Sequence, residues 1–312
     1  MELSDAQAVV TGGAGFVGSH LAERLLSEGA NVTIVDDLSN GRREWVPDGA
    51  TFIEGDLTRN SVVKNSIDAS IDVVFHLAAR KDVNDPHPRS QFEANTEMTA
   101  SILDRMAAVG VEHIAFTSSS TVYGEAPRPT PEDYPQAPIS MYGAGKTAEE
   151  ALISSSVHGA NLSAWIFRFA NIVGPRLQSG AVIVDFIDKL LADPTSLEIK
   201  GDGRQAKSYM AIESCIDAMV HVVREATADR AVYNLGTRTT SSVITIADIV
   251  SETMGLEPEY EFTGGDRGWT GDVPKMRLSI EKLRALGWEP PESSDTAVRQ
   301  ATEALLDQRT GT

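Results

Sequence analysis

Three side chains near the middle of the chain have the types and spacing needed for acid–base chemistry. Tyr142 and Lys146 lie four residues apart in Tyr-Gly-Ala-Gly-Lys, so on a helix they share one face. Ser119 precedes them, at the end of an apolar stretch that predicts a strand. A phenol titrates near pH 10, and a nearby ammonium group favours its ionised form. The set predicts a phenolate base, Tyr142, activated by Lys146, with the Ser119 hydroxyl aligning the group that loses its proton.

A glycine-rich loop near the N-terminus predicts a dinucleotide site. Gly12, Gly15 and Gly18 form a G-x-x-G-x-x-G pattern between an apolar strand and a helix expected to begin near Gly18. Such glycines let backbone N–H groups approach a pyrophosphate, and the positive end of the helix faces it. A bare glycine triplet is also compatible with a tight turn. However, Asp36 ends the second strand, where a carboxylate accepts hydrogen bonds from the adenosine ribose and repels a 2′-phosphate, so NAD is expected rather than NADP.

Two further acidic residues adjoin the expected NAD site. Asp37 follows Asp36 and adds to the preference for NAD. Asp56, followed by Leu57, ends the third strand. Asp56 is either a turn residue or a carboxylate facing the adenine amino group. Its place beside the strand ends that bind the cofactor favours the second interpretation.

The elements that must hold these residues alternate between strand and helix. Apolar strands are expected at 8–10, 32–35, 51–53, 73–77, 114–117 and 162–170, and helices at 19–28, 60–67, 90–109 and 142–157. Alternating strands and helices form a parallel sheet through right-handed crossovers, and strands buried on both faces have continuous apolar runs. We therefore predict an α/β fold with a Rossmann-type, doubly wound parallel sheet.

The second half of the chain is less regular. Helices are expected at 181–192, 211–226, 245–254 and 294–309, a strand at 231–235, and a loop at the proline-rich segment 127–138. Residues 1–172, with about 205–243, are expected to form the NAD-binding domain. Residues 173–204 and 244–312 are expected to form a smaller α/β lobe that binds the substrate.

The composition excludes several classes of protein. Hydrophobic residues make up 41% and charged residues 23%, as in folded globular chains. The net charge of −18 argues against nucleic acid or an anionic membrane as a partner. The chain has no apolar run of membrane-spanning length and no signal-peptide pattern. Its single cysteine, Cys215, fits a reducing cytoplasm.

The basic residues are unequally divided between 19 arginines and 8 lysines. Acidic chains that are poor in lysine are typical of proteins that work at high salt concentration. We treat adaptation to salt as a hypothesis, because solubility alone also favours net charge.

Sequence blocks over nearly the whole chain resemble those of extended short-chain dehydrogenases/reductases that act on nucleotide sugars. In order they are TGGAGFVGSHL, DDLSNGRRE, EGDL, FHLAA, TSSSTVYGE, YGAGK, FRFANIVGPR and GDGRQAKSY, continuing through Gly271–Pro274 and Ala285–Trp288. Within this family SSSTVYG and GWTGDV are most similar to UDP-glucose 4-epimerases, especially archaeal ones.

The resemblance implies a role for each matching residue. Tyr142 is the base, Lys146 its partner and ribose ligand, and Ser119 the aligning hydroxyl. Asn95 lies near the cofactor and stiffens the central helix. The NAD-binding residues are Gly12, Gly15, Phe16, Val17, Gly18, Asp36, Asp37, Ser39, Asn40, Asp56, Leu57, Leu77, Ala78, Ala79, Lys81, Asn95, Tyr142 and Lys146. The substrate-binding residues are Lys81, Ser119, Ser120, Tyr142, Asn171, Arg176, Lys207, Arg267 and Met276.

The chain departs from the family at two cationic positions. Lys207 stands where an arginine is usual, and Trp269 replaces a second arginine. Arg267 and Arg176 are therefore expected to hold the diphosphate in preference to Arg204.

The implied reaction interconverts UDP-glucose and UDP-galactose through a 4-keto intermediate, with tightly bound NAD. Three alternatives begin with the same oxidation at C4: 4-epimerases of UDP-N-acetylglucosamine or UDP-glucuronate, and a UDP-glucuronate decarboxylase. Met276 occupies the position whose bulk controls entry of N-acetylated sugars. A 4,6-dehydratase needs an Asp-Glu pair where Ser120 and Thr121 stand. A non-catalytic NAD-binding protein would typically lack Tyr142 or Lys146, and both are present.

Other polar residues are expected to be structural. His76 ends an apolar strand and is expected in the core or groove, because the six histidines and one cysteine show no metal-ligand spacing. The acidic residues near 148–150 and in the C-terminal helix are expected on solvated faces. A homodimer built on the helices near 90–109 and 142–157 is implied by the resemblance.

Overall fold

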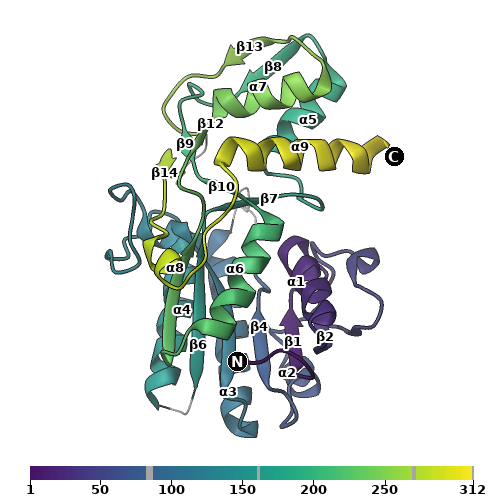
Figure 1. The fold of residues 1–312 in the computed structure, drawn as a ribbon, viewed down its shortest axis with the longest axis vertical. Coiled ribbons are helices and arrows are strands. Elements are labelled where there is room, and N and C mark those ends of the chain that lie inside the picture. Colours follow the sequence, from purple (N-terminus) through teal and green to yellow (C-terminus); the bar gives the residue numbers. More distant parts are fainter. Residues whose placement is uncertain (82–86, 160–161, 269–271, 311–312) are drawn as a thin grey trace. The chain divides into compact units, whose positions relative to one another are not determined.

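The computed structural model describes residues 1–81, 87–159, 162–268 and 272–310 (Figure 1). The chain forms two compact units. The first comprises Met1–Val122, Met141–Arg168 and Met219–Tyr233, and the second comprises Tyr123–Ser140, Phe169–Ala218 and Asn234–Thr312. The chain passes between the units several times, so neither unit is continuous in sequence. The assignment of NAD to one lobe and substrate to the other stays a prediction.

The first unit is built on a seven-stranded sheet with the order β11-β6-β5-β4-β1-β2-β3. The pairs from β3 to β5 are parallel. The sheet confirms the Rossmann-type α/β fold. The strands are β1 (Gln7–Thr11), β2 (Asn31–Asp36), β3 (Thr51–Glu54), β4 (Val73–His76), β5 (His113–Ser119), β6 (Ser163–Phe169) and β11 (Arg230–Leu235).

The helices of this sheet follow the strands in the chain. They are α1 (Phe16–Ser27), α2 (Asn60–Ser66), α3 (Pro88–Val109), α4 (Met141–Gly159) and α6 (Ile212–Glu225), with short 3-10 turns η1 (Arg43–Trp45) and η2 (Ser120–Tyr123). Apolar side chains of α2, α3 and α4 share one core cluster with β1, β4 and β5. Burying these side chains on the sheet holds α3 and α4 beside each other, which fixes where the first turn of α4 lies.

The strand order brings several polar residues together at the carboxyl ends of the parallel strands. The chain runs from β1 outward to β2 and β3, then returns to β4 on the other side of β1. In open α/β sheets, ligands bind at the carboxyl ends of the strands where this order reverses. Thr11, Asp36, His76 and Ser119 are the last residues of β1, β2, β4 and β5.

The second unit packs helices around its own apolar cluster. Its helices are α5 (Val182–Ala192), α7 (Val243–Met254), α8 (Glu281–Ala285) and α9 (Ser294–Thr310), and α5, α7 and α9 supply most of the cluster. Three small sheets accompany them, β10-β7, β12-β9-β14 and β13-β8. Their strands are β7 (Asn171–Val173), β8 (Ser196–Ile199), β9 (Ala206–Lys207), β10 (Tyr209–Ala211), β12 (Ser241–Ser242), β13 (Glu259–Phe262) and β14 (Lys275–Met276).

The long elements agree with the sequence prediction, and 127–138 is a loop. Boundaries differ by one to three residues: α1 begins at Phe16 rather than near Gly18, and β5 extends over His113–Ser119 rather than 114–117. The strands of two to four residues in the second unit were not predicted, because they are too short to show a period of two. No helix among the described residues is long and apolar enough to cross a membrane.

Candidate active site

The glycine loop is pressed between the end of β4 and the first turn of α1. Gly12 has φ +68°, and a Cβ there would lie 2.8 Å from the backbone nitrogen of Ala78. A Cβ on Gly18 would lie 2.2 Å from the carbonyl oxygen of Gly12. Only glycine fits both places. The backbone therefore reaches the helix N-terminus without side chains in the way, which suits a pyrophosphate.

Asp36 is held against this loop. Its Oδ2 accepts a hydrogen bond from the Ala14 N–H at 3.0 Å and its Oδ1 accepts one from the Leu38 N–H at 2.8 Å. Burial raises the pKa of the Asp36 carboxyl, and the two N–H donors oppose that rise. The side chain is thus fixed at the end of β2, where its remaining lone pairs can accept the ribose hydroxyls of NAD.

The other acidic residues near the predicted adenosine site are also anchored. Asp37 Oδ1 accepts the Ser39 N–H at 2.9 Å and the Ser39 hydroxyl at 2.5 Å. Asp56 Oδ1 accepts the Thr58 N–H at 2.9 Å, and its Oδ2 lies 3.1 Å from a guanidinium nitrogen of Arg80. Burial raises the pKa of Asp56, but the Thr58 hydrogen bonds and Arg80 outweigh it, so the pKa lies below its usual value.

Two residues predicted to bind the cofactor have their side chains engaged elsewhere. Leu57 is 3% exposed and packs in the core cluster of the sheet. The Asn95 amide accepts the Arg80 N–H at 2.7 Å and donates to the Arg80 carbonyl at 3.0 Å. Asn95 therefore fixes the segment after β4, which contains Leu77, Ala78, Ala79 and Lys81.

The predicted catalytic residues lie on adjacent elements. Tyr142 and Lys146 occupy the first turns of α4, and Ser119 ends β5 beside the buried Ser120. The Lys146 ammonium lies 4.5 Å above the ring of Phe116, and the Lys81 ammonium lies 5.4 Å from the ring centre of Tyr142. Ser119 Oγ accepts from the Thr121 hydroxyl at 2.9 Å. Since Ser119 is the acceptor there, its own O–H is able to donate to a substrate oxygen.

The electrostatics of Tyr142 correct one expectation. Lys146 was expected to lower the pKa of the phenol, but in the protein alone the pKa of Tyr142 lies above its ordinary value. Burial is the main cause, and the negative charge of Glu149 adds to it. The Lys146 ammonium is 3.2 Å from Glu149 Oε2, so its charge is already largely compensated.

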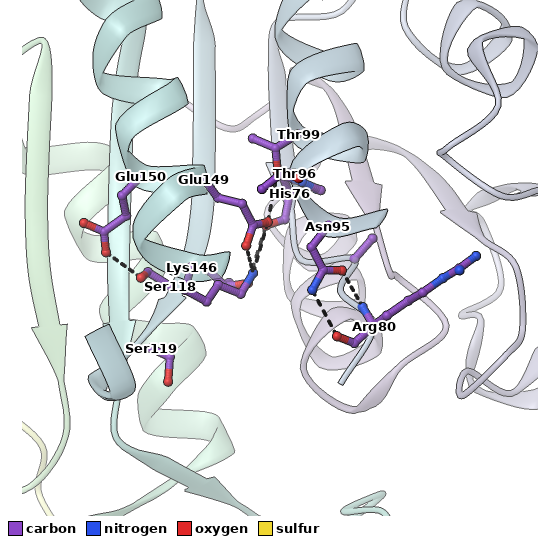
Figure 2. A network of polar contacts seen from close by, with 12 residues as sticks. His76, Arg80, Asn95, Thr96, Thr99, Ser118, Ser119, Lys146, Glu149 and Glu150 are labelled. Carbon is purple, nitrogen blue, oxygen red and sulfur yellow. Dashed lines mark hydrogen bonds and ion pairs between the residues drawn. The ribbon is translucent and has the colours of Figure 1, made fainter. Parts of the chain in front are cut away.

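The acidic residues of α4 are buried, so the prediction of a solvated face was wrong. Glu149 is 0% and Glu150 2% exposed. The two carboxylates leave α4 on opposite sides (Figure 2). Glu150 binds the Arg168 guanidinium at 2.7 Å and the Ser118 hydroxyl at 2.5 Å. Arg168 interrupts the apolar run of β6, and a cation inside a buried strand was the sequence signal for a buried acidic partner.

Behind Lys146, four residues that sequence reasoning did not assign to the site form a hydrogen-bonded chain. Glu149 Oε1 accepts the Thr99 hydroxyl at 2.9 Å, and Thr99 Oγ1 is 3.0 Å from His76 Nε2. His76 Nδ1 is 2.8 Å from the Thr11 hydroxyl. Burial, aided by the charge of Lys146, lowers the pKa of His76 to about 3. His76 is therefore a neutral core residue, and among the described residues no group of three or more His, Cys, Asp or Glu side chains could hold a metal ion.

In the second unit, the predicted diphosphate ligands are partly brought together. Lys207 Nζ lies 2.5 Å from Asp272 Oδ1, and Arg267 donates to the Asp272 carbonyl at 2.8 Å and pairs with Glu125. Met276 is paired with Lys207 in the β9–β14 register. These residues make one cationic cluster whose charges are matched by carboxylates.

The remaining predicted substrate ligands lie outside this cluster. Asn171, on β7, donates through its backbone N–H to the Ser208 carbonyl at 3.1 Å, one residue from Lys207. The Arg176 N–H is bonded to Gln308 of α9 at 3.1 Å. Arg204, the third cation considered, is exposed. Trp269, which replaces a family arginine, lies outside the described residues.

A family model matches this arrangement. The model of the NAD dependent epimerase/dehydratase family covers residues 8–236, from the first strand to the last of the sheet. The chain belongs to this family. The glycine loop, the fixed Asp36 carboxylate and the start of α4 are thus parts of an NAD-dependent epimerase/dehydratase.

Relatives in this family include UDP-sugar enzymes of similar length. The UDP-glucose 4-epimerase of Mycolicibacterium smegmatis is 31% identical over 95% of this chain and 97% of its own. A putative UDP-glucose 4-epimerase of the archaeon Methanocaldococcus jannaschii is 29% identical over 90% and 92%. UDP-glucuronic acid decarboxylase 4 of Arabidopsis thaliana is 32% identical over 96% of this chain and 68% of its own.

Solved structures of family members have the same fold. A crystal structure of a UDP-galactose 4-epimerase is 39% identical, with a TM-score of 0.89 over 97% of this chain and 99% of its own. The UDP-glucose 4-epimerase of Thermus thermophilus, solved in complex with NAD, is 29% identical, with a TM-score of 0.86 over 96% and 98%. The glycine loop of this chain leaves room for a pyrophosphate, and its Asp36 carboxylate can accept ribose hydroxyls. Both features are suited to NAD, the cofactor in that structure.

Proposed function

We propose that the protein is a UDP-glucose 4-epimerase that interconverts UDP-glucose and UDP-galactose through a 4-keto intermediate, with NAD retained between turnovers. The observation that carries the proposal is the placement of Tyr142 and Lys146 at the start of α4, with Ser119 at the end of the neighbouring β5. Full-length similarity to UDP-glucose 4-epimerases supports it.

The chain's own residues supply the proton chemistry of this reaction. When bound, NAD would supply the acceptor and donor of the hydride at C4, and its oxidised form would add a positive charge that favours the phenolate. Tyr142 takes the proton of the sugar 4-hydroxyl and later gives it back. Ser119 donates a hydrogen bond to the reacting oxygen and aligns it. Lys146 holds the nicotinamide ribose and carries a positive charge near the phenol.

The cofactor contacts follow the loop and the strand ends. The N–H groups of Phe16 and Val17, in the first turn of α1, face the pyrophosphate. Asp36 accepts the ribose hydroxyls, and Asp37, Ser39, Asn40 and Asp56 complete the adenosine site. Leu57 contributes only through its backbone, because its side chain is in the core.

The diphosphate of the substrate is held by the cationic cluster of the second unit. Lys207 is paired with Asp272, and Arg267 with Glu125. When the substrate binds, its phosphates replace these carboxylates as partners of the two cations. Met276 lies beside Lys207 in this cluster, whereas Asn171 and Arg176 lie outside it and are proposed to contact the nucleotide sugar at other points. A firmly held diphosphate and a loosely held sugar let the 4-keto ring turn its other face to the hydride donor.

We further propose a cytoplasmic homodimer built on α3 and α4. Reducing conditions suit the single Cys215, and both helices belong to the unit that carries the catalytic residues. Analytical ultracentrifugation checks the assembly state. A lone 33.5 kDa species at micromolar concentration would contradict the dimer.

Chromatography of nucleotide sugars tests the function. Purified protein is incubated with UDP-glucose, without added NAD, and the expected product is UDP-galactose. Tyr142→Phe should lower turnover by about 10²- to 10⁴-fold, the usual contribution of a general base. Absence of product even with added NAD would overturn the glucose assignment. UDP-N-acetylglucosamine and UDP-glucuronate are then the substrates to try, and release of carbon dioxide from UDP-glucuronate would indicate a decarboxylase, the activity named for the Arabidopsis relative.

A further inference from the structure

The hydrogen-bonded chain behind Lys146 has only one consistent direction. Thr11 Oγ1 accepts the Ala78 N–H at 3.2 Å and shares the Leu77 N–H with the Thr11 carbonyl, and its own hydrogen is available to His76 Nδ1. A neutral His76 then carries its proton on Nε2 and donates to Thr99. The Thr99 hydroxyl is left to donate to Glu149 Oε1.

The chain ends in a carboxylate that is paired with an ammonium group. Glu149 accepts from Thr99 and from Lys146, whose ammonium is 3.4 Å from Oε1 and 3.2 Å from Oε2. Both members of the ion pair are at most 2% exposed, and a buried charge is tolerated only with such a partner. Figure 2 shows Lys146 and Glu149 facing Thr99 of α3, while Glu150 faces Ser118 on the other side of α4.

We propose that Glu149 is a positioning residue that anchors the Lys146 ammonium beside Thr99 of α3 and, through its negative charge, opposes formation of the Tyr142 phenolate. This inference rests on the proposed function only in naming Tyr142 as the base. The charge of Glu149 is the second cause, after burial, that raises the pKa of Tyr142. The carboxylate therefore adds to burial in disfavouring the phenolate.

The other charged groups around the pair do not substitute for Glu149. Lys81 lies over the Tyr142 ring and favours the phenolate. On β4, His76 is neutral, and β5 presents Phe116 and Ser118. Glu150 is matched by Arg168 of β6. The acidic and basic side chains at the N-terminal end of α3, Arg89, Glu93 and Glu97, are exposed.

The pH dependence of turnover tests this role in the NAD-loaded enzyme. Glu149→Gln keeps the shape of the side chain and one oxygen that can accept from Thr99, and it removes the charge, so the acid limb of the kcat–pH profile should move down by about one pH unit or more. Glu149→Asp keeps the charge and should leave the limb where it is, with a lower kcat. Glu150→Gln, the matched change on the opposite side of the same helix, should not move the limb. An unshifted limb in folded Glu149→Gln would overturn the proposal.

A spectroscopic titration separates this proposal from the proposed function. The ultraviolet absorbance of the Tyr142 phenolate, measured as the difference from Tyr142→Phe, needs no substrate. Its midpoint should be lower in Glu149→Gln than in the unchanged enzyme, whatever sugar is turned over. Equal midpoints would contradict the role of Glu149. The titration tests this role even if no tested sugar is epimerised. If Glu149→Gln does not fold, the Glu149→Asp midpoint serves, and a rise of about one unit above the unchanged enzyme would overturn the proposal.

Discussion

At the scale of single residues, the site depends on which charges are buried and what faces them. Tyr142 and Lys146 alone suggest a simple pair, in which an ammonium makes a phenol acidic. The structure adds Glu149, which neutralises that ammonium and raises the pKa of the phenol further. Without NAD, Tyr142 is therefore a weak acid that stays protonated, and the positive ring of oxidised NAD, when bound, would add to Lys81 in favouring the phenolate.

The buried His76 gives the protein a specific sensitivity to acid. Its pKa is lowered to about 3 in the folded chain, against about 6.5 in the unfolded chain. The unfolded state thus binds the extra proton between these values, so stability is complete above pH 6.5 and falls as the pH falls. At about 1.4 kcal/mol per pH unit, this one group removes roughly 2 kcal/mol of unfolding free energy by pH 5.

Urea unfolding at several pH values checks this effect. Between pH 6.5 and 5, the slope of unfolding free energy against pH should be smaller in His76→Gln than in the unchanged protein. The difference should approach the slope for one bound proton, about 1.4 kcal/mol per pH unit. The exposed His158→Gln serves as the control variant. Identical slopes for His76→Gln and the unchanged protein would show that His76 is not held neutral.

At the scale of elements, α4 combines an active face with a structural one. The helix presents Lys146 and Glu149 toward α3, and on its other side Glu150 binds Arg168 of β6. The second pair ties the helix to the sheet without touching the predicted reacting groups.

Breaking the pair between Glu150 and Arg168 should cost much more than removing both charges. Arg168→Met leaves a buried carboxylate without its counter-ion, with an expected loss of about 3–5 kcal/mol of unfolding free energy. Arg168→Met combined with Glu150→Leu removes both charges and should recover most of that loss. Chemical denaturation of the two variants measures the difference. A double variant no more stable than the single one would contradict the account.

The sequence predicts the features that depend on residues close together in the chain, and it does not predict those that depend on distant partners. The strands ending in Thr11, Asp36 and Ser119 and the helix carrying Tyr142 follow from apolar runs and local spacing. The burial of Glu149 and Glu150 does not, because their partners Thr99 and Arg168 are 50 and 18 residues away in the chain. Glu149 lies three residues after Lys146, which is a local clue, but an acidic residue at that spacing is equally common on solvated helices.

At the scale of the whole molecule, the dominant property is excess negative charge. The chain has 45 acidic and 27 basic residues. Among the described residues, many ion pairs are exposed, such as Arg89–Glu93 and Arg299–Glu252, and each of these contributes at most about 1 kcal/mol. The hypothesis of adaptation to salt requires that repulsion within the folded chain outweigh the stabilisation that salt removes from these pairs.

Thermal melts at increasing KCl test the hypothesis of adaptation to salt. Screening shortens the range of repulsion from about 30 Å at 0.01 M to about 3 Å at 1 M, so Tm should rise by several degrees over that range. A Tm that is flat or falls with KCl would count against a chain selected for high salt.

The most direct test of the central claim, a redox-neutral inversion at C4, is to follow the hydrogen on that carbon. UDP-glucose carrying deuterium at C4 is incubated with the protein in ordinary water, without added NAD, and the product is examined by NMR. The account predicts UDP-galactose with the deuterium retained at C4, because the same hydride leaves and returns within one closed site. UDP-galactose with solvent hydrogen at C4 would show that inversion proceeds by proton exchange, and would contradict the mechanism built on Tyr142, Lys146 and NAD.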